Sequence, residues 1–174
     1  FYVESGGQVS DTGVLACYRD DSPEPQWEVQ VSDMRQPVPG LIVHVGQVTH
    51  GRPRVKDPVW ALVDADRRMD IARNHTATHL LHSELRYILG EHVQQAGSLV
   101  APDRLRFDFT HSSMLTQEEL DAVEQSVNDA ILANYPLEIE HTSYRDAVTK
   151  GAMALFGEKY GDEVRVIKIG LPDE

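Results

Sequence analysis

Residues 66–90 contain the strongest pattern in the chain and read DRRMDIARNHTATHLLHSELRYILG. Asp66 belongs to the residue types that cap helix N-termini, and Gly90 to those that end helices, so the segment predicts one long helix. Successive helical residues are turned by about 100°, so one side carries His75, His79, His82 and Arg86, and the other Ala77, Leu81, Leu85 and Ile88. We therefore expect the leucine side to face a core and the histidine side to face a cleft.

Two histidines of this helix, His75 and His79, lie four residues apart, which puts their rings one turn apart on the same side. Such a pair can bind one metal ion, although a solvated or hydrogen-bonded pair has the same spacing. Zinc peptidases of this type need Glu directly after the first His as general base, where this chain has Thr76. Peptidase activity is therefore not expected.

The residues before this helix, 1–65, predict a small β-barrel subdomain. They contain short β-branched runs separated by loops rich in proline, where proline removes hydrogen-bond donors and favours turns. The runs lie at residues 8–9, 13–15, 27–31, 41–45 and 59–63, and the loops at residues 20–25 and 37–40.

Residues 66–174 predict an α+β fold with helices packed on one face of a sheet. Thr116 and Glu119 have the spacing of a capping box, so a second helix is expected to begin there and to end before Pro136. Alternating residues predict strands at 104–109, 137–141 and 164–169, and a short helix is expected at 144–156.

The composition is that of a globular protein without a membrane segment, since 41% of the 174 residues are hydrophobic and no apolar run approaches the length of a bilayer. A soluble, cytoplasmic protein is expected. The formal net charge of -12 argues against a general nucleic-acid binder, so any RNA contact should be local. Cys17 is the only cysteine, which excludes a disulfide within the chain. The first residue, Phe1, suggests an excised fragment.

Several segments together carry a resemblance to a known family. They are NHTATHLLH at residues 74–82, QAGS at 95–98, LRFDFTH at 105–111, FYVESGGQVSDTG at 1–13 and GAMALFGEKYGD at 151–162. With this spacing they resemble the editing region of alanyl-tRNA synthetases over nearly the whole chain. Threonyl-tRNA synthetases and free-standing alanine-type editing proteins share the histidine motif but not all of the flanking segments.

The resemblance implies the fold and a metal site. It implies a β-barrel subdomain over residues 1–65, followed by the two-layer α+β core that threonyl and alanyl editing domains share, over 66–174. It also implies zinc bound by His75 and His79, with a Cys and a His three residues apart completing the site beyond this segment. Because zinc in proteins normally has at least three protein ligands, we expect zinc and activity to be weak or absent in this chain alone.

The implied reaction is hydrolysis of the ester that joins serine or glycine to tRNA for alanine. A pocket selecting alanine cannot exclude glycine well, because one methyl group contributes only ~1 kcal/mol, so errors must be removed afterwards. Water is the expected nucleophile, and the ion would either lower the pKa of this water or hold the substrate amino group.

The resemblance also implies roles for residues outside the metal site. Thr78 would meet a bound serine side chain, although a backbone hydrogen bond is an equal alternative, and Gln95 would orient the ester or the water. Gly97 and Ser98 would contact the terminal adenosine or the developing oxyanion, or form a simple turn. Arg106 is a further expected substrate contact.

The expected partners are the acceptor end of tRNA for alanine and the other, ATP-binding, parts of the same synthetase. Residues expected to contact the tRNA are Gly6, Gly7, Gln8 and Arg73, with further candidate cations at Arg67, Arg68, Arg104 and Lys159. His111 occupies a family position with either a functional or a structural role. The alternatives are a free-standing editing protein, a noncatalytic tRNA-binding module and a protein-interaction domain.

Overall fold

The computed structural model describes residues 1–18, 22–152 and 161–170. Their internal contacts form two compact units, Phe1–His75 with Leu99–Arg106, and Thr76–Ser98 with Phe107–Glu174. The predicted domain boundary after residue 65 is not tested by this grouping and stays a prediction. None of the helices in the described part of the chain has the length and apolar character needed to cross a lipid bilayer.

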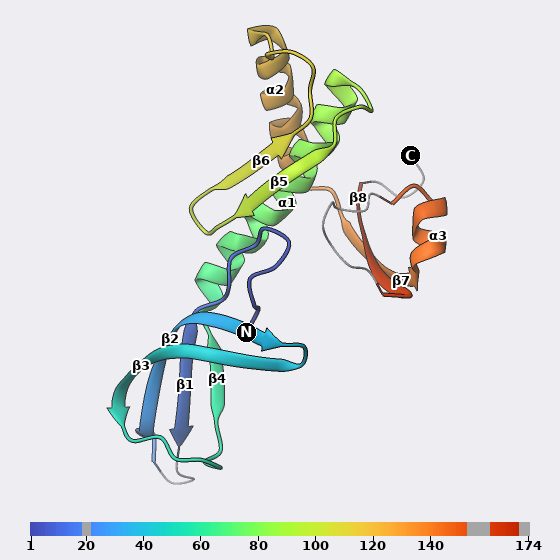
Figure 1. Cartoon of the computed structure of the whole chain (residues 1–174). Coiled ribbons are helices and arrows are strands. Elements are labelled where there is room, and N and C mark those ends of the chain that lie inside the picture. The colour runs from blue at the N-terminus through green and yellow to red at the C-terminus, as the bar shows by residue number, and fades with distance from the viewer. Residues whose placement is uncertain (19–21, 153–160, 171–174) are drawn as a thin grey trace. The chain divides into compact units, whose positions relative to one another are not determined.

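The first unit contains a four-stranded antiparallel sheet with the order β3-β2-β1-β4 (Figure 1). Its strands are β1 (Gly13–Tyr18), β2 (Pro25–Val38), β3 (Leu41–Gly51) and β4 (Trp60–Val63). The predicted strands are thus present, except that residues 8–9 form only an isolated bridge. The sheet is open in the described residues, with β3 and β4 at its edges, so the predicted closed barrel is not confirmed.

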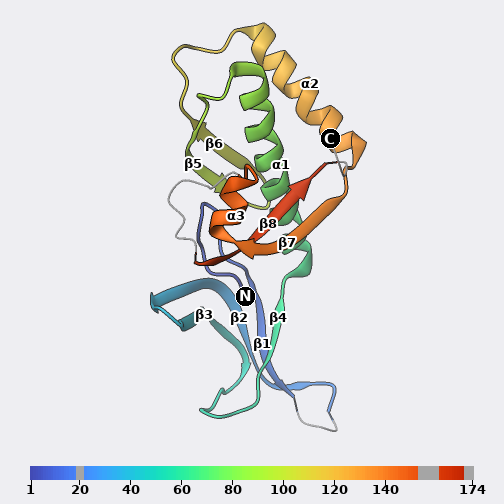
Figure 2. The ribbon, with the colours of Figure 1, turned by 90° about the vertical axis from the view of Figure 1, so that its right-hand side faces the viewer.

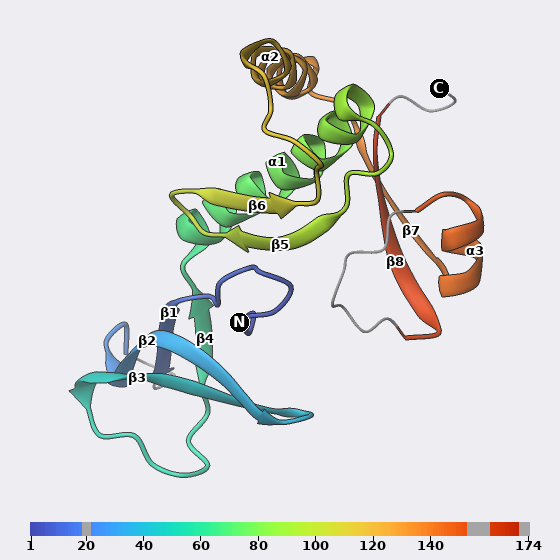
Figure 3. The same ribbon diagram turned by 45° about the horizontal axis from the view of Figure 1, so that its top comes forward.

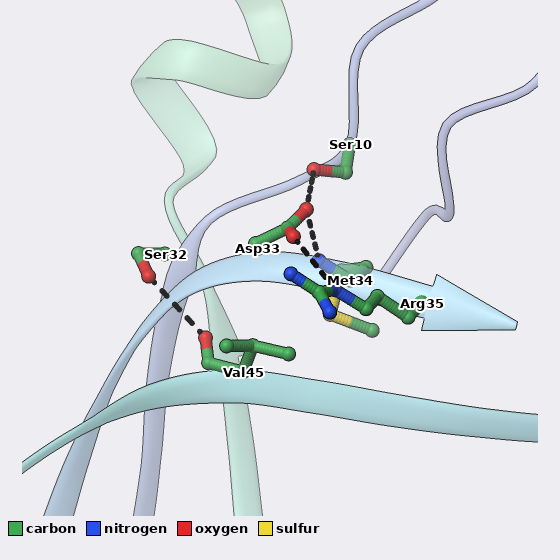
Figure 4. A network of polar contacts seen from close by, with 6 residues as sticks. All are labelled: Ser10, Ser32, Asp33, Met34, Arg35 and Val45. Atoms are coloured by element: carbon green, nitrogen blue, oxygen red, sulfur yellow. Dashed lines mark hydrogen bonds and ion pairs between the residues drawn. The ribbon is translucent and has the colours of Figure 1, made fainter.

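Strand β2 contains a β-bulge in the middle of the sheet. Val31 pairs with Gly46 and Asp33 pairs with Val45, so the residue between them, Ser32, is the extra one. The Asp33 carboxylate accepts hydrogen bonds from the Met34 backbone N–H at 2.7 Å and from the Ser10 hydroxyl at 3.5 Å (Figure 4). The bulge therefore keeps its polar groups paired while Val31 and Met34 both remain buried.

Helix α1 (Ala65–Leu89) begins two residues earlier than expected for a helix capped by Asp66. The cap is Asp64, whose carboxylate accepts the Arg67 backbone N–H at 3.0 Å. At the other end the Gly90 N–H donates to the Arg86 carbonyl, and Gly90 has a φ of 114°. Only glycine adopts such a backbone angle without strain, which confirms Gly90 as the helix stop.

The N-terminal segment is anchored to the first turns of α1 by a buried charge. Asp11 is 2% exposed and accepts hydrogen bonds from the Arg68 guanidinium and from the Tyr2 backbone N–H. Burial raises the pKa of Asp11, but the hydrogen bonds from Arg68 and Tyr2 outweigh it and hold that pKa below its usual value. Asp11 is therefore ionised at neutral pH, and it fixes residues 2–11 on the helix.

The second unit has a hydrophobic core between α1, the hairpin of β5 (Gln95–Val100) with β6 (Leu105–Phe109), and α2 (Gln117–Ala133) (Figures 2 and 3). Its buried centre consists of Leu85, Val93 and Val123. The predicted capping box of α2 is present, because the Thr116 hydroxyl accepts the Glu119 N–H and the Glu119 carboxylate accepts the Thr116 N–H. The leucine side of α1 faces this core, as predicted.

The remaining part of this unit is a β-hairpin with a short helix. Strands β7 (Leu137–Ser143) and β8 (Glu163–Ile169) pair antiparallel, and α3 (Tyr144–Thr149) follows β7 directly. The Ser143 hydroxyl caps α3 by accepting the Asp146 N–H at 3.1 Å. The helix expected at 144–156 is thus seen in its first part, and residues 153–156 lie outside the described residues. The described residues after 65 thus combine helices with antiparallel strands, as an α+β fold requires. The single sheet that was expected is not confirmed, because β5–β6 and β7–β8 form separate two-stranded sheets there.

Candidate functional site

The structure brings one of the two predicted metal ligands into contact with the glycine-rich N-terminal segment. The Nδ1 atom of His75, in α1, lies 2.7 Å from the Oε1 atom of Gln8. Both side chains are half-buried in the first unit. His75 is an expected metal ligand and Gln8 an expected tRNA contact, and their contact with each other has no signal in the sequence.

Gln8 is presented to His75 by a tight turn. The backbone N–H and carbonyl of Ser5 and Gln8 pair with each other, at 3.2 Å and 2.9 Å. Between them Gly6 and Gly7 have φ angles of 57° and 85°, the positive values that a type I′ turn requires at both central residues. The glycine pair is therefore explained by the turn itself, while its predicted contact with tRNA remains a prediction.

His79 and Thr78 lie in the next turn of α1, in the second unit. His79 is half-buried, whereas Thr78 is only 6% exposed. A hydroxyl this deeply buried can meet a substrate only if the substrate side chain enters the interior beside α1. The proposed role of Thr78 toward serine remains a prediction.

His82 departs from the expectation that the histidine side of α1 faces a cleft. It is 6% exposed, and its ring packs against Phe107 of β6 with the ring centroids 5.0 Å apart. Neither ring nitrogen of His82 has a hydrogen-bond partner among the described residues. The expectation was wrong at this position because the β5–β6 hairpin covers the helix there, so His82 belongs to the interior.

Burial, and after it the positive charge of Arg86, lower the pKa of His82. An unfolded histidine titrates near pH 6.5, so between the lowered pKa and this value the unfolded chain binds more protons than the folded chain. The contribution of neutral His82 to the free energy of unfolding should therefore be fully present above about pH 7.5 and should be lost as the pH falls below about 6.5. It amounts to about 1.4 kcal/mol for each pH unit by which folding lowers the pKa of His82. We expect His82→Leu to reduce this slope of unfolding free energy against pH in urea titrations.

The matched control for this prediction is His141→Leu, because His141 is exposed in β7, so that a smaller slope in His82→Leu than in His141→Leu is due to the buried position. An equal slope in wild type and His82→Leu would show that His82 does not resist protonation in the folded chain.

The predicted substrate residues Gln95, Gly97 and Ser98 lie on strand β5, and Gly97 and Ser98 do not form the simple turn that was their alternative. The Nε2 of Gln95 donates to the Ser98 hydroxyl at 3.2 Å. A Cβ atom placed on Gly97 would lie 2.9 Å from the Asp108 carboxylate of β6. The hairpin therefore brings Gln95 and Ser98 together, and the Asp108 carboxylate lies in the space that a side chain at Gly97 would enter.

The predicted cations are on the surface, and several already have partners within the chain. Arg73 pairs with Asp70 at 2.6 Å, and Arg106 is exposed in β6. Arg104 pairs with Asp103, Arg68 with Asp11, and the Arg67 guanidinium donates to the Ser10 carbonyl. The two exposed pairs, Arg73 with Asp70 and Arg104 with Asp103, are weak and do not prevent a phosphate contact. Arg68 differs from them, because its partner Asp11 is buried. Lys159 lies outside the described residues.

His111, for which a structural role was one alternative, lies beside His92. The His92 Nε2 and His111 Nδ1 atoms are 2.9 Å apart, and the Thr110 hydroxyl next to it donates to the His92 carbonyl at 3.1 Å. These contacts join the connection after α1 to the end of β6. His111 therefore has a structural hydrogen bond to a residue to which the sequence analysis assigned no role.

Two histidines of this chain fit part of a zinc site. His75 and His79 are one helical turn apart, and the contact with Gln8 orients the first of them. Across residues 1–18, 22–152 and 161–170, no three His, Cys, Asp or Glu side chains lie close enough together to hold a metal ion. The only cysteine, Cys17, is buried in β1. A complete zinc site would therefore need ligands in addition to the described residues.

Comparison with known proteins gives the same family as the sequence resemblance. No family model matches the chain. It is 56% identical over 169 residues to an alanine–tRNA ligase of Chloroflexus aurantiacus, and 57% identical over 170 residues to that of a Roseiflexus species. It is also 52% identical over 169 residues to the alanine–tRNA ligase of Desulforamulus reducens.

These matches cover 97% or 98% of the chain but only 18% of each relative. A segment that matches such enzymes along nearly all of its length is part of an aminoacyl-tRNA synthetase. More particularly, the chain belongs to the alanine–tRNA ligase family and corresponds to one segment of its members.

Proposed function

We propose that this segment carries the editing site of an alanine–tRNA ligase, which hydrolyses the ester of tRNA for alanine mischarged with serine or glycine. The observation that carries the proposal is the pair His75 and His79 on one side of α1, with His75 held by Gln8 at 2.7 Å. An ordered histidine ring is what a hydrolytic metal site needs. A ligase that selects alanine also needs such a site, because its substrate pocket cannot exclude glycine well. A zinc ion bound there would supply Lewis-acid chemistry at the ester.

In this proposal the other residues act on the substrate and on the attacking water. The Gln95 amide is oriented by its bond to the Ser98 hydroxyl, which leaves its carbonyl oxygen to accept a hydrogen bond from water or from the substrate amino group. The Thr78 hydroxyl would accept a hydrogen bond from the hydroxyl of a bound serine, inside a buried site. Arg106 and Arg73, both exposed, would contact the acceptor end of the tRNA.

The test is hydrolysis of seryl-tRNA for alanine, with alanyl-tRNA as control, by this chain and by a version extended along the ligase sequence, together with the zinc content of each. We expect zinc and selective hydrolysis of the seryl ester in the longer protein, and little of either in this chain. Zinc without hydrolysis would indicate a noncatalytic tRNA-binding module. Neither zinc nor hydrolysis in the longer protein would contradict the proposal.

A further inference from the structure

The contact between Gln8 and His75 determines which nitrogen of the histidine carries the proton. A side-chain amide oxygen has no hydrogen and can only accept. With the Gln8 amide oriented so that Oε1 lies 2.7 Å from Nδ1 of His75, Nδ1 is the donor and carries the proton of the hydrogen bond. In the neutral ring the lone pair is then on Nε2, the nitrogen that is directed away from Gln8.

We propose that Gln8 is a positioning residue that prepares His75 for metal binding, by fixing the Nδ1–H tautomer and the orientation of the ring. The inference rests on the proposed metal-dependent editing site and assigns a role to a residue that does not touch the ion. A ligand histidine binds a metal ion through a nitrogen lone pair, and an acceptor on the other nitrogen holds the ring and makes the ligand more basic.

The backbone around Gln8 is built for such a role, because it is tied down on both sides. The Val9 N–H donates to the Val100 carbonyl at 3.0 Å, and the Val100 N–H donates to the Gly7 carbonyl at 2.8 Å. Val100 is itself 2% exposed, so the anchor lies in the interior of the first unit. Together with the preceding turn, in which residues 6 and 7 are glycine, these bonds fix the backbone position from which the Gln8 side chain extends.

The helix that carries His75 is held to the same region. The side chain of the preceding residue, Asn74, donates to the carbonyls of Ala101 at 2.8 Å and Pro102 at 3.3 Å. Both partners are thus anchored to residues 100–102: His75 through the side chain of the preceding residue, Asn74, and Gln8 through the backbone of its neighbours Gly7 and Val9. A hydrogen bond between two anchored groups is formed before any ligand arrives, which is the preorganisation that a ligand-orienting partner needs.

The matched variants are Gln8→Met, which keeps the size of the side chain but removes the acceptor, and Gln8→Glu, which keeps an acceptor at the same reach. The first readout is the tautomer of His75 in this chain without metal, from the ¹⁵N shifts of its ring at a pH where the ring is neutral. We expect Nδ1–H in wild type and Gln8→Glu, and a mixture of tautomers in Gln8→Met.

The second readout is the affinity of a full-length ligase of this sequence for Zn²⁺, measured by competition with a chelator. We expect Gln8→Met to weaken it about 10- to 100-fold and Gln8→Glu to restore it to within a few fold of wild type. Unchanged tautomer and unchanged zinc affinity in Gln8→Met would overturn the proposal. Weaker tRNA binding with both unchanged would instead assign Gln8 to the tRNA.

These outcomes are separate from a failure of the editing proposal itself. The tautomer is observed without metal, tRNA or turnover, so it reports on Gln8 even if the ligase edits elsewhere. Loss of the Nδ1–H tautomer in Gln8→Met, combined with a ligase that binds no zinc at His75, would support the orientation of the ring but contradict the metal site.

Discussion

His79→Ala is expected to reduce hydrolysis of seryl-tRNA by the full-length ligase about 100-fold or more. The reason is that His79 would be a direct ligand of the ion, and losing a ligand should cost more than the 10- to 100-fold typical of losing a group that only orients one. Alanine is a better helix former than histidine, so the change should leave α1 intact. The measurement is the rate of deacylation at saturating enzyme, with zinc content determined on the same sample.

His141→Ala is the matched control for His79→Ala, since this histidine is exposed in β7 and has no proposed role. Aminoacylation with alanine by both variants should stay normal, which would show that the rest of the ligase is folded. Normal deacylation by His79→Ala, at unchanged zinc content, would exclude the metal assignment. Normal deacylation with zinc lost would show that the reaction does not need the ion.

Gly46→Ala is expected to lower the free energy of unfolding by about 3 kcal/mol or more. A Cβ atom at this position would lie 2.1 Å from the Gln30 carbonyl oxygen and 3.0 Å from the Val31 Cα. These are backbone atoms of β2 beside the bulge, so no side chain can rotate away and the two strands must separate. Urea unfolding of this chain measures the effect as a lower midpoint.

The control is Gly161→Ala, where the nearest atom to a new Cβ is the Glu163 carbonyl oxygen at 3.7 Å. This distance is ordinary contact, so the midpoint should change little. A second comparison is Gly40→Ala, where no atom lies within 4 Å but φ is +82°, so only backbone strain of about 1 kcal/mol or somewhat more is added. If Gly46→Ala were no worse than Gly40→Ala, the close approach at the bulge would be wrong.

Where an element depends on neighbours in the chain, it could be predicted from the sequence. The helix containing His75 and His79, the capping box at Thr116 and the stop at Gly90 all follow from interactions within a few residues. The strands β1–β4 followed from runs of β-branched residues. Strand β5 was missed, because Gln95, Gly97 and Ser98 have low strand propensity and extend only by pairing with β6.

The side on which a helix is covered was less predictable than the helix. Helical periodicity placed His82 with His75 and His79, but Phe107 from β6 packs on His82 and takes it into the interior. Likewise, the N-terminal strands would close into a barrel only if the edge strands β3 and β4 paired with each other. The described residues do not show this pairing.

By itself the sequence determined the paired histidines, because a spacing of one helical turn is a local property. The matching segments likewise gave the family and the class of chemistry to be tested. Only the tertiary structure decided which groups meet these histidines. Gln8 reaches His75 across 67 positions of sequence, through a glycine turn and a backbone anchor at Val100. Such a contact depends on how distant segments pair, and no local periodicity or propensity carries that information.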